Sequence, residues 1–154
     1  MTDVPIVEAV RATIATLTGP ETGTDRAQAW AVVAIGWATV ESERAIAELA
    51  GPLGIDASAF VPATGSTVLG SFALVATGVL DGAVDLAVVE PSTEGRLAAH
   101  LARHGEGPTV AWLAQPETDL ANPVRSDGPF GPERLLPSQS DGLLRLLVAA
   151  AGTI

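Results

Sequence analysis

Two histidines, His100 and His104, have the clearest spacing for metal chemistry in this 154-residue sequence. They are four residues apart in a predicted helix, so they project from one side of it, and such a pair can bind zinc. A complete site needs at least one further ligand, for which Glu94, Glu106 or a loop carboxylate are the candidates. The pair leaves two interpretations: a metal site, or a connector helix that carries histidines.

The rest of the helix favours the connector interpretation. Leu97 and Leu101 form its predicted buried stripe, and the histidines lie at the edge of that stripe beside Arg96. His104 is close to the helix C-terminus, where the helix dipole favours a protonated imidazole. We therefore predict no metal site on this helix.

Other reactive side chains are scarce. The chain has no cysteine, which excludes thiolate metal sites and disulfides. All eight basic residues are arginine, so no lysine is present to form a Schiff base. The serines Ser42, Ser58 and Ser66 have no identifiable histidine partner, and no hydrolase triad is predicted.

The composition indicates one globular domain, with 47% hydrophobic and 17% charged residues. A net charge of −10 argues against a nucleic-acid partner and would attract a cationic ligand. No apolar run reaches the roughly 18–20 residues that span a bilayer, and the first residues lack the pattern of a signal peptide. We expect a cytoplasmic protein without a membrane partner. Its use of arginine, alanine, glycine, valine and leucine is typical of actinobacteria.

The first half of the chain alternates helical and extended patterns. A helix is predicted over 3–18 and a buried apolar strand over 29–40. A short amphipathic helix follows over 41–51, which Gly51 and Pro52 should end. Three further extended segments are predicted, at 57–62, 66–78 and 83–90.

The second half repeats much of this plan. A helix over 93–104, capped by Ser92 or Thr93 and ended by Gly105, leads to a strand over 108–114. Turn residues follow, and then short strands over 133–137 and 143–150. The order predicts an α+β fold of two paired βαβββ modules with an extra N-terminal helix.

The domain boundaries follow from these elements. The N-terminal helix and its connector occupy 1–28, and a single domain occupies 29–154. Within it we expect the first module at 29–91, the linking helix at 92–105 and the second module at 106–150.

Two stretches resemble a known family: "VVAIGWATVESERAIAEL" (32–49) and "DLAVVEPSTEGRLAAHLARHGEGPTVAWLA" (85–114). They are similar to the glyoxalase modules of the vicinal-oxygen-chelate superfamily, and the second is similar to members related to methylmalonyl-CoA epimerase. The tail "GPFGPERLLPSQSDGLLRLLV" is compatible with the closing strands, so the resemblance covers about residues 30–149. It implies a sheet curled into a cup, and in this family a divalent metal is bound there.

The ligand positions that the resemblance implies do not carry ligands here. They fall near Ala34, Ala87 and Val110, and at or near Arg145. None of these side chains can bind a hard or borderline cation. We therefore expect no metal and no cofactor.

The resemblance also indicates which residues line the cup. Alternation along the strands places Gly36 with Ala34, Trp112 with Val110, and Asp85 with Ala87. Small side chains such as Ala34 and Gly36 leave space that a protein fills or uses. Ala34, Gly36, Ala87, Val110 and Trp112 are therefore the predicted ligand-binding residues.

Asp85 and Arg145 are the predicted catalytic residues, if there is catalysis. An inward Arg145 could hold a carboxylate or enolate, or pair with Asp85. Each also has a structural interpretation: Asp85 as a turn residue at the strand entry, and Arg145 on the solvent face with Leu144 and Leu146 inside. Trp112 could stack on a flat ligand or belong to the core.

Three functions remain open from the sequence. The first is metal-independent binding of a small molecule, such as sequestration of a metabolite or antibiotic, by a homodimer. The second is a metal-independent isomerase, lyase or cyclase of secondary or acyl metabolism, with Asp85 as base and Arg145 as charge stabiliser. The third is a structural interaction domain whose cup is filled.

Overall fold

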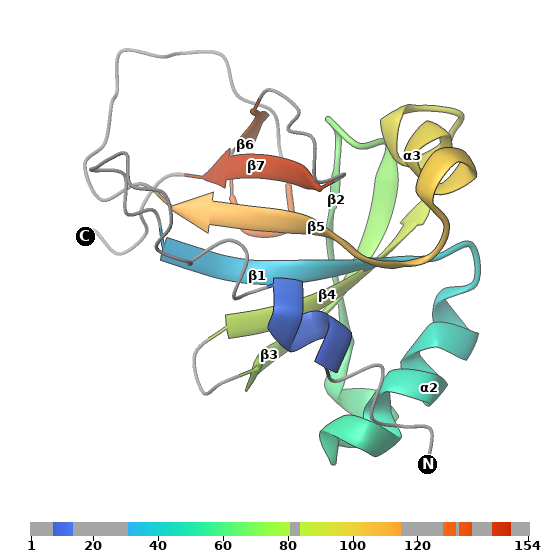
Figure 1. The fold of residues 1–154 in the computed structure, drawn as a ribbon, viewed down its shortest axis with the longest axis vertical. Helices are drawn as coiled ribbons and strands as arrows, with labels where there is room; N and C mark the ends of the chain where they lie inside the picture. Colours follow the sequence, from blue (N-terminus) through green and yellow to red (C-terminus); the bar gives the residue numbers. More distant parts are fainter. Residues whose placement is uncertain are drawn as a thin grey trace.

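The computed structural model describes residues 8–13, 31–80, 84–114, 128–131, 133–136 and 143–148. These residues form a mixed seven-stranded sheet in the order β2-β3-β4-β1-β5-β7-β6 (Figure 1). The strands are β1 Ala31–Ala38, β2 Val61–Ser66, β3 Ser71–Leu80, β4 Val84–Pro91, β5 Gly107–Ala114, β6 Glu133–Leu135 and β7 Leu144–Val148. No described helix is long and apolar enough to cross a membrane.

The strand pairing follows the plan of two modules. In the first, β1 runs parallel to β4, and β3 lies antiparallel between β4 and β2. In the second, β5 runs parallel to β7, and β6 is antiparallel to β7. The first strands of the two modules, β1 and β5, pair antiparallel and join the halves. The α+β fold with paired modules is confirmed.

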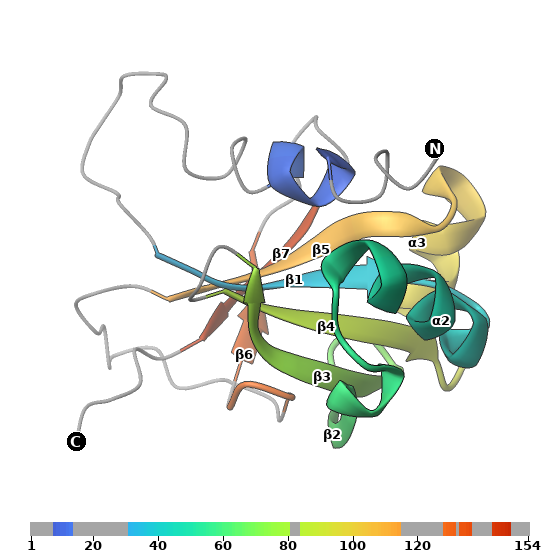
Figure 2. The same ribbon diagram turned by 90° about the horizontal axis from the view of Figure 1, so that it is seen from below.

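The sheet is strongly curled. Both edge strands, β2 and β6, lie on the side of the central β1 and β5 that faces away from helix 8–13 (Figure 2). A hydrogen bond from Ser66 on β2 to Glu133 on β6 joins these edges, although they are at opposite ends of the strand order. The side of the sheet that carries this contact is therefore the concave one.

Helix α2, Ser42–Leu53, is longer than the sequence predicts. Gly51 and Pro52 lie in its last turn and do not end it. The helix ends instead at Gly54, which has a φ of 71° and donates its amide to the carbonyl groups of Ala50 and Gly51. A left-handed residue of this kind closes a helix more effectively than the Gly-Pro pair, because it satisfies the last carbonyl groups.

Helix α3, Arg96–His104, is shorter than predicted at its start. Its N-cap is Gly95, and neither Ser92 nor Thr93 caps it, because the chain bends over residues 92–95 before the first helical turn. The amide of Leu97 donates to the carbonyl of Leu69 at 2.9 Å, so tertiary contact sets the start of this helix. Its end at Gly105 is as predicted.

Two of the predicted strands have different bounds. Residues 57–59 form the 3₁₀ turn η1 Ala57–Ala59, because the Asp56 carboxylate accepts the amide of Ser58. The segment predicted as one strand over 66–78 contains a turn at 67–70, in which Gly70 has a φ of 72°. Both differences come from local turns that an apolar pattern alone does not reveal.

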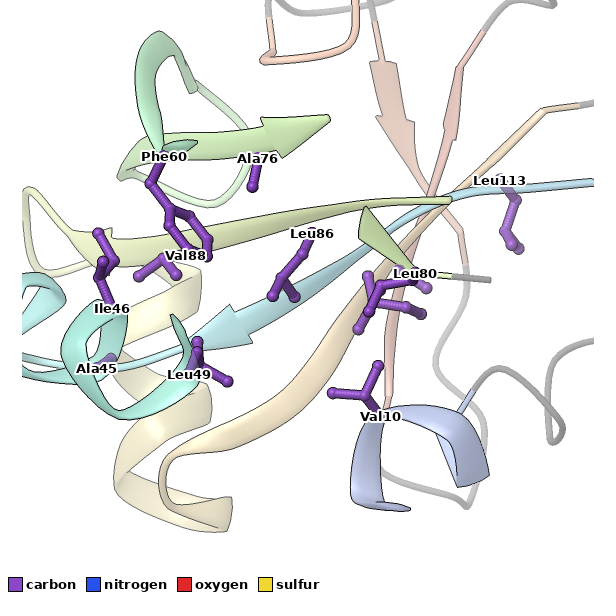
Figure 3. Packing of buried hydrophobic residues seen from close by; sticks show 12 residues of the cluster. Val10, Ala45, Ile46, Leu49, Phe60, Ala76, Leu80, Leu86, Val88 and Leu113 are labelled. Carbon is purple, nitrogen blue, oxygen red and sulfur yellow. The ribbon is translucent and has the colours of Figure 1, made fainter. Parts of the chain in front are cut away.

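The convex side of the sheet carries the first core (Figure 3). Helix α2 packs there through Ile46 and Leu49, and helix 8–13 packs there through Val10, which is 1% exposed. Thr13 also donates from its hydroxyl to the carbonyl of Pro108 at 3.3 Å. The helical residues 8–13 therefore pack on the convex face and do not cover the cup. The remainder of the helix predicted over 3–18 lies outside the described residues.

Candidate functional site

The concave side of the sheet carries a second buried cluster, which we call the cup face. Its strand residues share the same inward orientation and are small or apolar, apart from one tryptophan: Ala34, Ala38, Ala73, Ala87, Val89, Val110, Trp112, Leu146 and Val148. Leu69 from the β2–β3 turn and two leucines of α3, Leu97 and Leu101, belong to the same cluster. The cup is thus apolar over most of its surface.

The structure places the predicted ligand-binding positions together on this face. Ala34, Ala87, Val110 and Trp112 are all 0% exposed. Gly36 pairs with Ala87 on one side and with Val110 on the other, so these residues form one row across three strands.

Trp112 fills the space beside Gly36. A Cβ atom on Gly36 would lie 2.7 Å from Cζ3 of Trp112 and 2.9 Å from Cβ of Val110, which is too close for real carbon atoms. The small residues of β1 therefore accommodate the indole ring, and the space that they leave is occupied.

Asp85 lies at the entry of β4 and has a structural contact. Its register with Ala34 puts it on the same face of the sheet. Its carboxylate accepts the amide of Gly78 at 2.7 Å, where Gly78 has a φ of 63° and the β3–β4 register shifts. This contact agrees with the interpretation of Asp85 as a turn residue at the strand entry.

Arg145 lies on the convex side of the sheet. It pairs with Ala111, which belongs to the convex core, whereas Leu146 pairs with Trp112 on the cup face. Because side chains alternate along a strand, Arg145 does not face the cup, although its predicted catalytic role requires that orientation. It has the other predicted orientation, in which Leu144 and Leu146 are inside. Asp85 and Arg145 point to opposite faces and do not form a pair across the cup.

The residues present do not fit the metal that the resemblance implies. Three of the ligand positions that the resemblance implies carry Ala34, Ala87 and Val110. On the last strand, the residue that faces the cup is Leu146. None offers a nitrogen or oxygen ligand from its side chain. Among the described residues, no group of three or more His, Asp or Glu side chains has a geometry that could hold a metal ion.

The polar centre of the cup is Glu133, which sequence reasoning missed. This carboxyl group is 0% exposed. Its Oε1 accepts the indole N–H of Trp112 at 2.8 Å, and its Oε2 accepts the hydroxyl of Ser66 at 2.5 Å. Ser66 in turn accepts the amide of Leu69 at 3.1 Å. We call Glu133, Ser66 and Trp112 the cup triad.

Burial raises the pKa of Glu133 above its ordinary value of 4.5, and the hydrogen bonds from Ser66 and Trp112 offset part of this rise. A carboxylate in an apolar interior is costly without a compensating charge, so burial favours the neutral acid. The backbone at Gly128 lies directly against the carboxyl group, and a Cβ there would overlap it. Phe130, in the same segment as Gly128, packs on the triad through Trp112, with the two ring centroids 5.0 Å apart at 60°.

The sequence carries only a weak signal for this triad. Glu133 begins a short predicted strand, and a charged residue at such a position ordinarily faces solvent. Alternation with the inward Leu135 was the available hint. Ser66 could not be linked to it, because the two residues are 67 positions apart and meet only through the curl of the sheet.

The histidine pair lies on α3, beside the cup and outside the triad. The ring centroids of His100 and His104 are 4.5 Å apart. His100 is 8% exposed, and burial, with smaller effects of His104 and Arg103, lowers its pKa below 6.5. Among the described residues the pair has no third ligand in reach.

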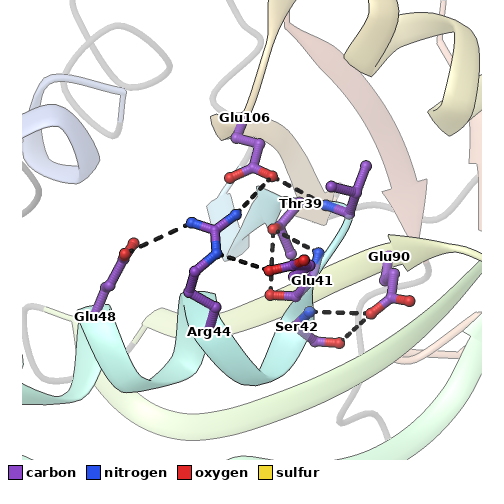
Figure 4. Close-up of polar contacts among 8 residues, drawn as sticks. Thr39, Glu41, Ser42, Arg44, Glu48, Glu90 and Glu106 are labelled. Atoms are coloured by element: carbon purple, nitrogen blue, oxygen red, sulfur yellow. Dashed lines mark hydrogen bonds and ion pairs between the residues drawn. The ribbon is translucent and has the colours of Figure 1, made fainter.

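A surface hollow at the start of α2 is lined by Val40 to Arg44 and Glu90. Figure 4 shows the polar contacts around it. Arg44 lies 2.8 Å from the carboxylate of Glu41 and 3.6 Å from those of Glu48 and Glu106. Glu90 accepts both the amide and the hydroxyl of Ser42, at 3.0 and 2.5 Å. Glu90 thus takes the place of a local N-cap, and these contacts anchor the helix to the ends of β1 and β4.

Comparisons with known proteins identify the fold. No family model matches the sequence, and no curated protein matches it. Several solved structures match over most of the chain, at identities that show the fold alone. The structure has the vicinal-oxygen-chelate fold that the sequence stretches resemble.

Three of these structures illustrate the similarity. Methylmalonyl-CoA epimerase from Mycobacterium tuberculosis has a TM-score of 0.62 at 18% identity, covering 79% of this chain and 88% of its own. A hypothetical protein from Bacillus halodurans C-125 has 0.60 at 14%, covering 82% and 99%. Streptomyces coelicolor methylmalonyl-CoA epimerase, in complex with 2-nitronate-propionyl-CoA, has 0.57 at 19%, covering 79% and 98%.

Proposed function

We propose that this protein binds a small organic molecule in its cup without a metal ion. The observation that carries the proposal is the cup triad: one buried carboxyl group, hydrogen-bonded to Trp112 and Ser66, in an otherwise apolar concave face. Apolar and aromatic walls with a few fixed polar groups are the usual composition of a small-molecule site. The ligand would contact Trp112 and Phe130 and make its polar contacts at Glu133.

Metal independence is supported by the side chains at the centre of the cup. Ala34, Ala87, Val110 and Leu146 supply no ligand. The fold itself is compatible with an organic ligand, since the Streptomyces coelicolor epimerase was solved in complex with 2-nitronate-propionyl-CoA. A metabolite or an antibiotic held without turnover is the form of this function that we propose.

A structural interaction domain with a filled cup is the second candidate. The fit of the Trp112 ring against Gly36 favours it, because that contact already occupies part of the concave face. An isomerase, lyase or cyclase is less favoured, since Asp85 holds the amide of Gly78 and Arg145 lies on the convex side. In an enzyme of this structure, Glu133 would be a better placed acid than either.

A thermal-shift screen of small organic molecules, on protein treated with EDTA, tests the proposal. A ligand present at about 100 times its Kd adds about 2.7 kcal/mol to the free energy of unfolding. For a chain of this size, that raises the melting temperature by about 5–10 °C. Trp112→Phe removes the indole N–H and should reduce the rise in melting temperature that the ligand causes. If no compound raises the melting temperature, the filled-cup function is supported instead.

We also propose that the protein is a cytoplasmic homodimer. A dimer is expected because members of the superfamily that bind drugs in this way are commonly dimers. Light scattering coupled to size-exclusion chromatography checks the assembly: a mass of twice 15.6 kDa supports the dimer, and a mass of 15.6 kDa contradicts it.

A further inference from the structure

The carboxyl group of Glu133 has no charged partner among the described residues. Its two hydrogen-bond donors, Trp112 and Ser66, are both neutral. No ion pair joins Glu133 to another described residue, although the side chain is fully buried. Buried carboxyl groups are ordinarily paired with a cation or kept neutral, so this one is able to accept a positive charge from outside.

A second polar group beside the triad is incompletely bonded. Ser71 is 4% exposed, and its Oγ has no hydrogen-bond partner. Ser71 pairs with Ser66 across β2 and β3, so the two side chains lie on the same face of neighbouring strands. Buried hydroxyl groups almost always have a partner, and an exception next to an uncompensated carboxyl group marks a place for a polar ligand group.

We propose that the ligand of the cup is an organic cation, whose protonated amine binds Glu133 and Ser71 and whose flat apolar part lies against Trp112 and Phe130. This inference rests on the proposed function and specifies its ligand class. Carboxyl and hydroxyl oxygens accept hydrogen bonds from an ammonium group. Aromatic rings beside it add a favourable cation–π interaction of about 0.5–2 kcal/mol. The formal net charge of −10 attracts such a ligand from a distance.

Access to Glu133 requires the backbone at Gly128 to move, because it lies directly against the carboxyl group. The arrival of a cation also changes the protonation of the site. Burial raises the pKa of Glu133, and a neighbouring ammonium group lowers it again. Binding at a pH where the free protein holds the proton therefore releases it, which calorimetry in two buffers of different ionisation enthalpy detects.

The test is isothermal titration calorimetry of EDTA-treated protein with benzylamine, benzyl alcohol and benzoate, three probes that share a ring and differ in charge. We expect the amine to bind at least about ten-fold more tightly than the alcohol, and benzoate to bind most weakly. Glu133→Gln should abolish the preference for the amine. Glu43→Gln removes the same charge from an exposed position of α2 and should keep it within about two-fold.

Ser71→Ala provides an independent variant, because removing a hydroxyl without an internal partner leaves the fold intact. It should weaken the amine about five- to ten-fold, whereas Ser58→Ala, at an exposed serine, should not. Circular dichroism establishes that each variant is folded. Should Glu133→Gln fail to fold, the preference in wild type and its loss in Ser71→Ala decide the outcome.

The failures of the two proposals differ. If the amine and the alcohol bind equally, or if Glu133→Gln keeps the preference, the cation inference is wrong while binding in the cup stands. If none of the three probes binds at millimolar concentration, both proposals are contradicted.

Discussion

Ser66 and Glu133 connect the two outermost strands of the sheet. The Ser66 hydroxyl on β2 donates to Oε2 of Glu133 on β6 at 2.5 Å, and both groups are buried. Five strands lie between them in the sheet order, so the bond exists only because the sheet is curled. It links the first module to the second in addition to the β1–β5 pairing, and the other oxygen of the same carboxyl group accepts the indole N–H of Trp112.

Removal of this link should destabilise the protein. Ser66→Ala leaves one oxygen of a buried carboxyl group and the amide of Leu69 without their partner. We expect a loss of about 1–3 kcal/mol in the free energy of unfolding, measured by urea denaturation. Ser71→Ala is the matched control on the neighbouring strand, and should change the free energy by less than about 0.5 kcal/mol. Equal effects of the two substitutions would show that the link does not contribute.

The contact between Gly36 and Trp112 gives a second prediction. Gly36→Ala places a methyl group 2.7 Å from the indole ring, and should cost about 1–3 kcal/mol in the free energy of unfolding. Gly51→Ala is the control, since a Cβ there meets nothing within 4 Å and the residue lies in helix α2. That change should stabilise by about 0.5–1 kcal/mol. A Gly36→Ala protein as stable as wild type would mean that the cup has room beside Trp112.

The buried acid predicts a pH dependence of stability. The pKa of Glu133 is raised in the folded state, so the unfolded chain loses this proton at lower pH than the folded protein does. The stability that neutral Glu133 contributes is present below pH 4.5 and is lost as the pH rises through the folded pKa.

Glu133→Gln should therefore gain stability relative to wild type as the pH rises above 4.5, by up to about 1.4 kcal/mol for each pH unit up to the folded pKa. Urea denaturation from pH 4 to pH 8 measures this difference. A difference that is independent of pH would mean that folding does not raise the pKa of Glu133.

His100 predicts a dependence of the opposite sign. Burial lowers its pKa below 6.5, with smaller contributions from His104 and Arg103, so the folded protein resists protonation that the unfolded chain accepts. The stability that neutral His100 contributes is present above pH 6.5 and is lost as the pH falls through the folded pKa. His100→Leu should remove this loss.

His104→Gln serves as the comparison for that variant. Burial is the largest cause of the shift at His100, so most of the acid sensitivity should remain when only His104 is changed. Thermal unfolding followed from pH 5 to pH 8 distinguishes the two variants. Identical pH profiles for His100→Leu and wild type would contradict the buried neutral imidazole.

Local and periodic features of the fold could be predicted from the sequence. Strands such as β1 and β4 carry continuous apolar residues. The resemblance implied one face for Ala34, Ala87 and Val110, alternation added Gly36 and Trp112 to it, and the structure has these residues on one side of the sheet. The ends of α2 and α3 could not be predicted as well, because Gly54 and the Leu69 carbonyl set them through geometry. The orientation of Arg145 could not be predicted from the sequence. An alternating strand is possible with Arg145 inward, and equally with Leu144 and Leu146 inward.

The cup triad could not be predicted, because its members come from β2, β5 and β6 and meet only in three dimensions. Glu133 is a residue type that ordinarily lies on the surface, and alternation with Leu135 is only a weak indication of burial. A long-range contact of this kind has no periodic signal in one sequence.

The most direct test of the central claim is the metal content of the His104→Gln protein after equilibrium dialysis against Zn²⁺, Ni²⁺ and Co²⁺. This variant removes the exposed member of the histidine pair on α3, so the pair cannot account for an ion that is retained. We predict far less than one ion per chain, with binding of the organic ligand unchanged in EDTA. One retained ion per chain, together with loss of ligand binding in EDTA, would contradict a metal-independent cup.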